Sequence, residues 1–435
     1  MHGADTIRAV HDPLITTLPG GARVVSEPLE GVRSVALGLW IATGSRDEPR
    51  AKAGVSHFIE HLLFKGSERY DAQAIAQLFD AMGGELNAAT SRETTVVYTR
   101  VPDERLDKAL DVLADMVFAP TFADVDSERE VVLEEFAMVD DNPQDLVHDL
   151  AAEAVFGGHP LGRPVIGSAE VIASVSPRSL RSYHAGAYVG SNVVLAAAGH
   201  VEHEHLVERF SGIHGGANGD SRVRRAPLRR RHAPSYRFLR RKTEQYHVVL
   251  AGHGIARDDE RRYAVALLDA ILGGSASSRL FQEIREKRGM AYSVYSYGSQ
   301  YADSGQVGIY VGTREDNLAE CLAVTVAELR DVAAGNLRPG ELERAKENLN
   351  GRMLLSLEST SNRMTRLGKA LVTETEIVPV DEILRRIDAV TPQEIASVAG
   401  ELFAPESLSA AGIGPRETRF RAAVGRVSPA LAERA

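Results

Sequence analysis

Hydrophobic positions along the first half of the chain follow two periods, alternation in some segments and a spacing of three to four residues in others. Alternating or continuous apolar runs are typical of strands, and the longer period is typical of amphipathic helices. In chain order, the first half predicts a strand at 34–41, helices at 52–64 and 71–82, strands at 85–90 and 94–101, and a helix at 104–116.

The second half of the chain repeats this order of elements, which indicates an internal duplication. Its elements are expected as a strand at 246–252, helices at 261–272 and 278–286, strands at 291–296 and 305–312, and a helix at 317–334. Strands that follow one another in runs favour a mixed or mainly antiparallel sheet over a doubly wound parallel one. The expected fold class is therefore α+β, with two homologous lobes, each a sheet packed with helices.

A segment rich in Gly, Asn, Asp and Pro separates the two repeats and is the expected linker. The expected organisation is an N-terminal lobe at 1–213, a linker at 214–234, a homologous C-terminal lobe at 235–416 and a tail at 417–435. The basic cluster at 222–231 lies inside this linker, and we interpret it as a solvated segment rather than a nucleic-acid surface.

The chain has 435 residues and is longer than one hydrophobic core usually supports, which agrees with two lobes. No apolar run approaches the roughly 20 residues that span a bilayer, and the start of the chain lacks the pattern of a secretory signal. Together with a single cysteine, Cys321, this favours a cytoplasmic protein. A formal charge of −10 argues against nucleic acid as a partner and mildly favours basic or unfolded peptides.

Candidate chemistry centres on the sequence His57-Phe58-Ile59-Glu60-His61 within the expected helix at 52–64. Its two histidines and its glutamate stand at i, i+3 and i+4, so all three lie on one helix face. The spacing H-x-x-E-H inverts the commoner zinc motif but keeps its roles, with two imidazole ligands and one carboxylate that contacts a water. The alternative is that these are ordinary helix histidines.

A zinc hydrolase needs a third protein ligand, and a downstream segment at 126–138 offers four glutamates. Glu128 and Glu135 are seven residues apart, so they share a helix face, and either could bind the metal while the other supports a histidine. A solvated acidic face is the alternative. His200, His203 and His205 form a second cluster, which we interpret as a solvated turn.

The chain resembles the pitrilysin/insulinase family, and specifically its mitochondrial processing peptidase branch and the bacterial counterparts. The residues that carry this resemblance lie at 54–67, 83–88, 128–135 and 141–143. The resemblance implies one Zn²⁺ per chain, bound by His57, His61 and Glu135, with Glu128 as supporting carboxylate. It also implies that Glu60 is the general base, which takes a proton from the attacking water and returns it to the leaving amine.

The resemblance extends to the segment at 273–292, where Arg285 and Tyr292 correspond to a pair that contacts the substrate in the family. The expected substrate-binding strand carries Glu85, Leu86, Asn87 and Ala88, and an extended peptide would add to it through main-chain hydrogen bonds. Unfolded or extended peptides are therefore the expected substrates.

The zinc motif and the Arg285/Tyr292 pair lie in different lobes. The resemblance therefore implies a homodimer with two composite sites, each of which combines the zinc motif of one subunit with the Arg285/Tyr292 pair of the other. Two other readings remain. The chain could be a noncatalytic peptide-binding subunit or scaffold of the same family, for which a broken motif would be typical. It could also be a thioether lyase with an H-x-x-E-H motif, but such enzymes use a cysteine ligand, and Cys321 lies far along the chain in an apolar pattern.

Overall fold

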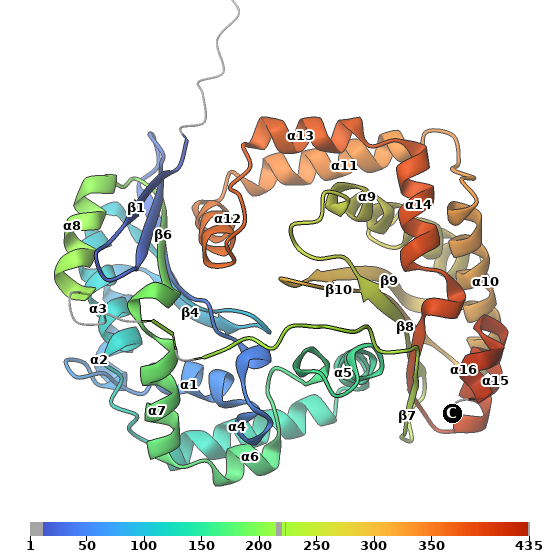
Figure 1. The fold of residues 1–435 in the computed structure, drawn as a ribbon, viewed down its shortest axis with the longest axis horizontal. Coiled ribbons are helices and arrows are strands. Elements are labelled where there is room, and N and C mark those ends of the chain that lie inside the picture. The colour runs from blue at the N-terminus through green and yellow to red at the C-terminus, as the bar shows by residue number, and fades with distance from the viewer. Residues whose placement is uncertain (1–11, 215–219, 222, 434–435) are drawn as a thin grey trace, which may run out of the picture.

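A computed structural model describes residues 12–214, 220–221 and 223–433 of the chain (Figure 1). The start of the chain, where no export signal is expected, lies outside these residues, as does part of the expected linker. No helix within the described ranges is both long enough and apolar enough to cross a membrane.

The first lobe is built on a six-stranded sheet in the order β1-β2-β6-β3-β5-β4. Its strands are β1 (Leu14–Thr17), β2 (Arg23–Pro28), β3 (Ser34–Ile41), β4 (Glu85–Thr90), β5 (Thr95–Pro102) and β6 (Val193–Gly199). Strands β2 and β6 pair in parallel, and the other pairs are antiparallel. Strand β4 pairs only with β5, so it forms a free edge of the sheet.

The second lobe repeats this topology in a five-stranded sheet of order β7-β11-β8-β10-β9. Its strands are β7 (Tyr236–Arg240), β8 (Tyr246–Gly254), β9 (Ala291–Gln300), β10 (Gly305–Thr313) and β11 (Ser409–Gly414). Strands β7 and β11 are parallel and the rest antiparallel, which matches β2-β6-β3-β5-β4 strand for strand. The predicted duplication and the predicted mixed sheet are both confirmed.

Helices cover both sheets, as expected for an α+β fold. The first half of the chain contributes α1 (Val55–Leu63), α2 (Ala72–Met82), α3 (Leu106–Phe118), α4 (Val125–Asp140), α5 (Pro143–Phe156), α6 (Ala169–Ser174), α7 (Pro177–Ala187) and α8 (His203–His214). The second half contributes α9 (Arg262–Leu272), α10 (Glu315–Ala333), α11 (Glu341–Ser356), α12 (Thr360–Val372), α13 (Val380–Ala389), α14 (Pro392–Leu402), α15 (Glu417–Val427) and α16 (Pro429–Glu433).

Two expected segments differ in the structure. The helix expected at 278–286 is instead a π-helix, Phe281–Glu286, with a wide hydrogen bond from Lys287 N to Gln282 O at 2.9 Å that spans five residues instead of four. The segment expected as a tail forms α15 and α16, and Phe420 and Leu431 are buried in the core of the second lobe. Burial of these apolar side chains makes the segment part of the lobe.

One helix of each lobe packs against the sheet of the other lobe. Helix α5 packs on β8 and β11 of the second sheet, and α12 packs on β3 and β6 of the first (Figure 1). Close approach of α12 requires a glycine, because a Cβ at Gly368 would lie 2.0 Å from Nε1 of Trp40 on β3. The two lobes of one chain are therefore joined by apolar packing on both sides.

A buried ionic network also joins the lobes. Arg46 of the first lobe donates to Glu93 Oε1 at 2.6 Å and to Asp303 Oδ1 of the second lobe at 2.6 Å. Glu93 in turn pairs with Arg257 of the second lobe. Charges that are buried and paired in this way fix the relative placement of the segments that carry them.

Candidate metal centre

Helix α1 carries the H-x-x-E-H residues and begins later than expected, at Val55 instead of residue 52. Gly54 stands at its N-cap with φ of 98°, and a Cβ there would lie 2.3 Å from the carbonyl oxygen of Ile166. The carboxylate of Glu48 accepts the backbone N–H of Gly54 at 2.7 Å and of Ser56 at 2.6 Å. It thus satisfies donors at the start of the helix that have no partner within the helix.

Three side chains converge where α1 meets α4. Ligand atoms of His57, His61 and Glu135 all lie within 4.8 Å of one another, the one such group of three or more in the described part of the chain. Oε2 of Glu135 lies 3.7 Å from Nε2 of His57 and 3.4 Å from Nε2 of His61. Ligand atoms on a tetrahedral zinc lie roughly 3.4 Å apart, given bonds of about 2.0–2.1 Å. The donor set and its spacing therefore fit zinc.

The second glutamate of α4 holds one histidine in position. Glu128 Oε1 lies 2.9 Å from Nδ1 of His61, and its other oxygen pairs with Lys65 at 2.6 Å. A hydrogen bond from Nδ1 to this carboxylate leaves Nε2 of His61 with a free lone pair, the form that binds a metal. Glu128 is buried, whereas the side chain of Glu135 is 39% exposed beside the histidines.

Burial sets the charge states at this centre. It lowers the pKa of His57 to about 4, with a smaller contribution from His61, so His57 is neutral at pH 7. Burial also raises the pKa of Glu60, and the charge of Glu135 acts in the same direction. Oε2 of Glu60 is buried and has no hydrogen-bond partner among the described residues. Hydrogen bonds from Thr90 and the neighbouring His61 oppose this rise in pKa, so Oε2 is the oxygen of Glu60 that is left to accept from a water.

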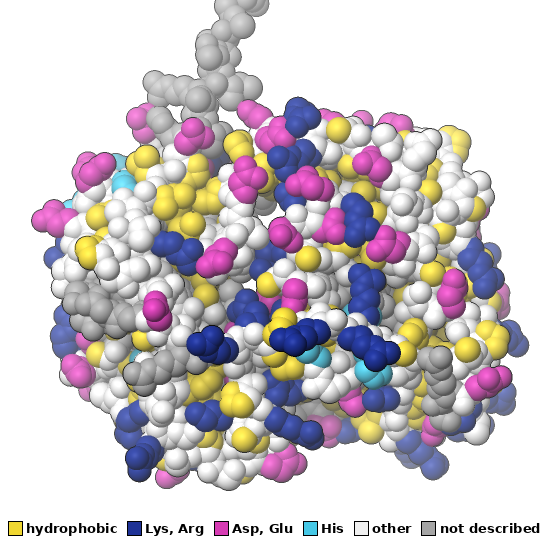
Figure 2. All heavy atoms as spheres, viewed as in Figure 1, with side chains coloured by type: hydrophobic (Ala, Val, Ile, Leu, Met, Phe, Trp, Pro, Cys, Tyr) yellow, Lys and Arg dark blue, Asp and Glu magenta, His cyan; other side chains and the backbone are white. Residues whose placement is uncertain are grey.

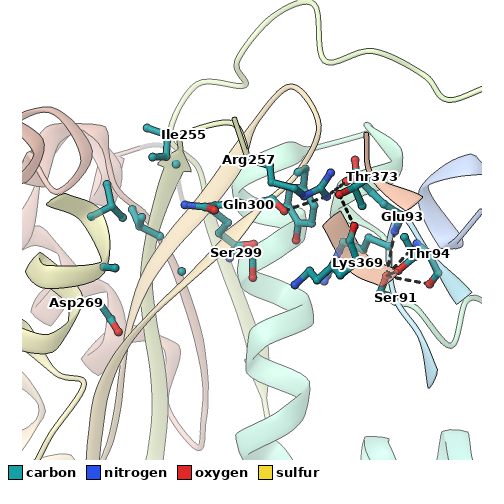
Figure 3. A pocket seen from close by; sticks show the side chains of 18 of the residues that line it. Ser91, Glu93, Thr94, Ile255, Arg257, Asp269, Ser299, Gln300, Lys369 and Thr373 are labelled. Atoms are coloured by element: carbon teal, nitrogen blue, oxygen red, sulfur yellow. Dashed lines mark hydrogen bonds and ion pairs between the residues drawn. The ribbon is translucent and has the colours of Figure 1, made fainter. Parts of the chain in front are cut away.

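The edge strand β4 packs against α1, and its side chains alternate between exposed and half-buried positions. Glu85, Leu86, Asn87 and Ala88 therefore lie beside the metal centre, with the outer backbone edge of their strand unpaired. The turn that follows β4 leads into a cavity of about 670 Å³ between the lobes, in which Glu93 and Arg257 are paired (Figure 3). None of His57, His61 and Glu135 lines this cavity.

Arg285 and Tyr292 lie together in the second lobe. The guanidinium of Arg285 stacks 4.7 Å from the ring centroid of Tyr292, which is 78% exposed. No hydrogen bond or ion pair within the described ranges links either residue to the metal cluster. In Figure 1, α1 and α4 lie in the left-hand lobe, and β9, which contains Tyr292, lies in the right-hand lobe.

The other histidine cluster does not form one site. His200 contacts Asp103, His205 contacts Asp107 at 2.7 Å, and the buried His203 bonds to Ser26 at 2.8 Å. Separate partners of this kind are typical of structural histidines.

Two residues of the metal centre were missed in the sequence. Lys65 follows His61 by four residues, so helical spacing could have indicated it. Glu48 lies outside the helix it caps, and no spacing rule identifies it.

Comparisons with known proteins identify the family of the chain. Residues 23–169 match the family described as insulinase (peptidase family M16), and residues 174–349 match the peptidase M16 inactive domain. An uncharacterized zinc protease of Streptomyces coelicolor is 43% identical over 92% of this chain and 88% of its own length. An uncharacterized zinc protease of Bacillus subtilis is 41% identical over 89% and 95%.

Solved structures share the fold at lower identity. A protease from Helicobacter pylori superposes with a TM-score of 0.87 at 22% identity, over 93% of this chain and all of its own. A peptidase M16 inactive domain from Pseudomonas fluorescens gives the same score at 24% identity, over 93% and 99%. The chain belongs to the insulinase family of peptidases, family M16.

Proposed function

We propose that this protein is a zinc-dependent endopeptidase that cleaves unfolded or extended peptides. The observation that carries the proposal is the convergence of ligand atoms of His57, His61 and Glu135 within 4.8 Å of one another, with a carboxylate oxygen of Glu60 on the same helix left unpartnered. Relatives named zinc proteases support the same assignment. One zinc per chain is expected, because the described residues offer one such cluster.

The residues have distinct roles in the proposed reaction. Bound zinc would act as a Lewis acid and lower the pKa of a water to roughly 7. Glu60 accepts a proton from the water that attacks the scissile carbonyl and returns it to the leaving amine. Glu128 keeps His61 in the tautomer that presents Nε2.

Substrate binding is assigned to the free edge of β4. An extended peptide can pair with Glu85, Leu86, Asn87 and Ala88 through main-chain hydrogen bonds, which tolerate many sequences. A folded protein cannot offer such a strand without unfolding locally, so unfolded and extended peptides are the expected substrates.

We further propose a homodimer in which the Arg285/Tyr292 pair of one subunit completes the metal centre of the other. Within one chain the lobes are joined by α5, α12 and the Arg46 network, and the pair stays open to solvent, with Tyr292 exposed and Arg285 half-buried. The face of α4 that carries Glu135 also exposes Val131 (50%) and Met138 (67%), apolar side chains that a partner would cover. There, Arg285 and Tyr292 would donate to the oxygen that becomes negative during attack.

A peptide-library digest read by mass spectrometry tests the activity. We expect cleavage that a chelator abolishes and added zinc restores. Glu60→Gln should keep zinc and lose activity by at least about a hundredfold, since Glu60 is a base and not a ligand. His57→Ala should lose the metal. Glu130→Gln, at an exposed position of α4, is the matched control and should behave as the wild type.

Two results would contradict the assignment. A zinc-loaded protein that cleaves no member of the library would favour the noncatalytic, peptide-binding alternative. A zinc-free Glu60→Gln variant, or one with normal activity, would show that the residue roles are wrong.

A further inference from the structure

A second cavity, of about 520 Å³, lies on the first lobe, away from the metal cluster. Its walls are the segment at 46–52 before α1, the turn around Pro160, helix α7 and the linker residues 223–226. None of the residues assigned to peptide hydrolysis lines it. An inference about this cavity therefore does not depend on the proposed peptidase activity.

The cavity is lined by four cationic side chains that form no ion pair with a carboxylate in the described part of the chain. These are Arg50, Lys52, Arg163 and Arg224. Lys52 lies 5.6 Å from the ring centroid of Tyr183, which positions its ammonium group at the wall. Arg163 donates to the carbonyl oxygen of Glu48 at 2.6 Å, while its Nε is buried and has no hydrogen-bond partner.

The acidic residues of the same wall are already engaged elsewhere. Asp47 binds Arg225 through two contacts of 2.9 Å, and Glu48 accepts the backbone N–H groups at the start of α1. Burial holds the pKa of Arg163 below its usual value; Glu48 opposes this effect, and the neighbouring Arg50 adds to it. The cavity therefore has excess positive charge in a protein whose formal charge is −10.

The surface around the cavity also carries positively charged side chains. Figure 2 shows Lys and Arg side chains gathered over the lower half of this face, where the linker crosses it. Arg229 and Arg230 of the linker are exposed, and neither forms a described ion pair. A concave site lined by one sign of charge focuses the field and attracts an oppositely charged ligand.

We propose that this cavity binds a small molecule that carries two or more phosphoryl groups. Guanidinium groups match phosphate oxygens in pairs, and the cavity is lined by three arginines, Arg50, Arg163 and Arg224, that have no carboxylate ion pair within the described ranges. A volume of about 520 Å³ suits a small-molecule ligand and exceeds the space that one phosphate needs. Four cations at the wall favour a multiply charged ligand over orthophosphate.

Calorimetric titration of the full-length protein with sodium tripolyphosphate in 150 mM NaCl tests the proposal. We expect saturable binding at one site per chain and binding of orthophosphate at least about tenfold weaker. Arg50→Gln with Lys52→Gln should weaken tripolyphosphate binding by about tenfold or more, since two charged contacts are lost. Zinc content and circular dichroism of this variant should match the wild type.

Arg229→Gln with Arg230→Gln is the matched control, because it removes the same charge from the same face outside the cavity. This variant should change the affinity by about twofold or less. Equal weakening by both variants would show general attraction of the face and would overturn the proposal. Absence of saturable binding, or binding confined to RNA or anionic vesicles, would overturn it as well.

Discussion

Two glutamates on one face of α4 differ in environment and in role. Glu128 is buried between His61 and Lys65, whereas Glu135 faces both histidines and is partly open to solvent. Because the buried carboxylate of Glu128 already has two partners, it is suited to support His61. The carboxylate of Glu135 lies beside both Nε2 atoms and is placed to bind the metal.

Substitution by glutamine separates these two roles. Glu135→Gln should weaken zinc binding by more than about a hundredfold, because a ligand oxygen loses its charge, and Glu128→Gln by about tenfold, through poorer orientation of His61. Competition with a zinc-chelating dye measures both affinities. Glu130→Gln should leave the affinity unchanged. A larger loss for Glu128→Gln than for Glu135→Gln would reverse the assignment.

At the scale of elements, the metal helix α1 depends on a cap supplied from outside it. Glu48 lies before the helix in a separate turn, and its two oxygens accept the N–H groups of Gly54 and Ser56. Helix α1 is only nine residues long and buries Phe58, Ile59 and Leu62. Its position therefore rests on packing and on this cap more than on its own helix propensity.

Burial raises the pKa of Glu48 to about 7 from an ordinary value of 4.5, which makes stability pH-dependent. Between these two values the folded protein keeps a proton that the unfolded chain has released, so the free energy of unfolding falls as pH rises. Glu48→Gln removes this titration. Between pH 5 and pH 8, the unfolding free energy of the variant should therefore increase relative to that of the wild type by about 2 kcal/mol.

Urea unfolding of the zinc-free proteins at both pH values measures this shift, and removal of zinc keeps metal binding out of the comparison. Glu130→Gln, which changes an exposed carboxylate, should follow the wild type at both values. Parallel pH profiles for Glu48→Gln and the wild type would contradict the raised pKa.

At the scale of the whole molecule, each lobe contributes a helix to the sheet of the other. The exchange of α5 and α12, together with the Arg46 network, holds the lobes of one chain in a single arrangement. Helix α5 directly follows α4, so the docking of the second lobe also fixes the end of the helix that carries Glu135.

Mixed dimers test whether sites are shared between subunits. His57→Ala and Arg285→Ala homodimers should each be nearly inactive, since every site carries one defect. In a mixed dimer one site has both defects and the other has none. With free exchange at equal amounts, half of the dimers are mixed, so activity should reach about one quarter of the wild type.

Peptide cleavage after co-incubation measures this recovery, and labelled subunits report the exchange itself. Failure to recover activity despite exchange would indicate sites that are completed within one chain.

The local pattern of residues in the sequence was sufficient to predict most helices and strands and the candidate metal motif. The strand at 34–41 and the edge strand at 85–90 have the boundaries expected from alternation, and the duplicated order of elements predicted two similar sheets. These features depend on side-chain periods of two or about 3.6 residues, which neighbouring residues alone determine. The spacing of His57, Glu60 and His61 on one helix face follows from the same local geometry.

Contacts between distant segments were decided only by the tertiary structure. The residue pattern left Glu128 and Glu135 as alternatives, resemblance assigned the ligand to Glu135, and only the packing of α4 against α1 shows which carboxylate meets both histidines. The exchange of α5 and α12 and the burial of the segment after residue 416 depend likewise on chain crossings. Such contacts join residues tens to hundreds of positions apart, and no local period encodes them.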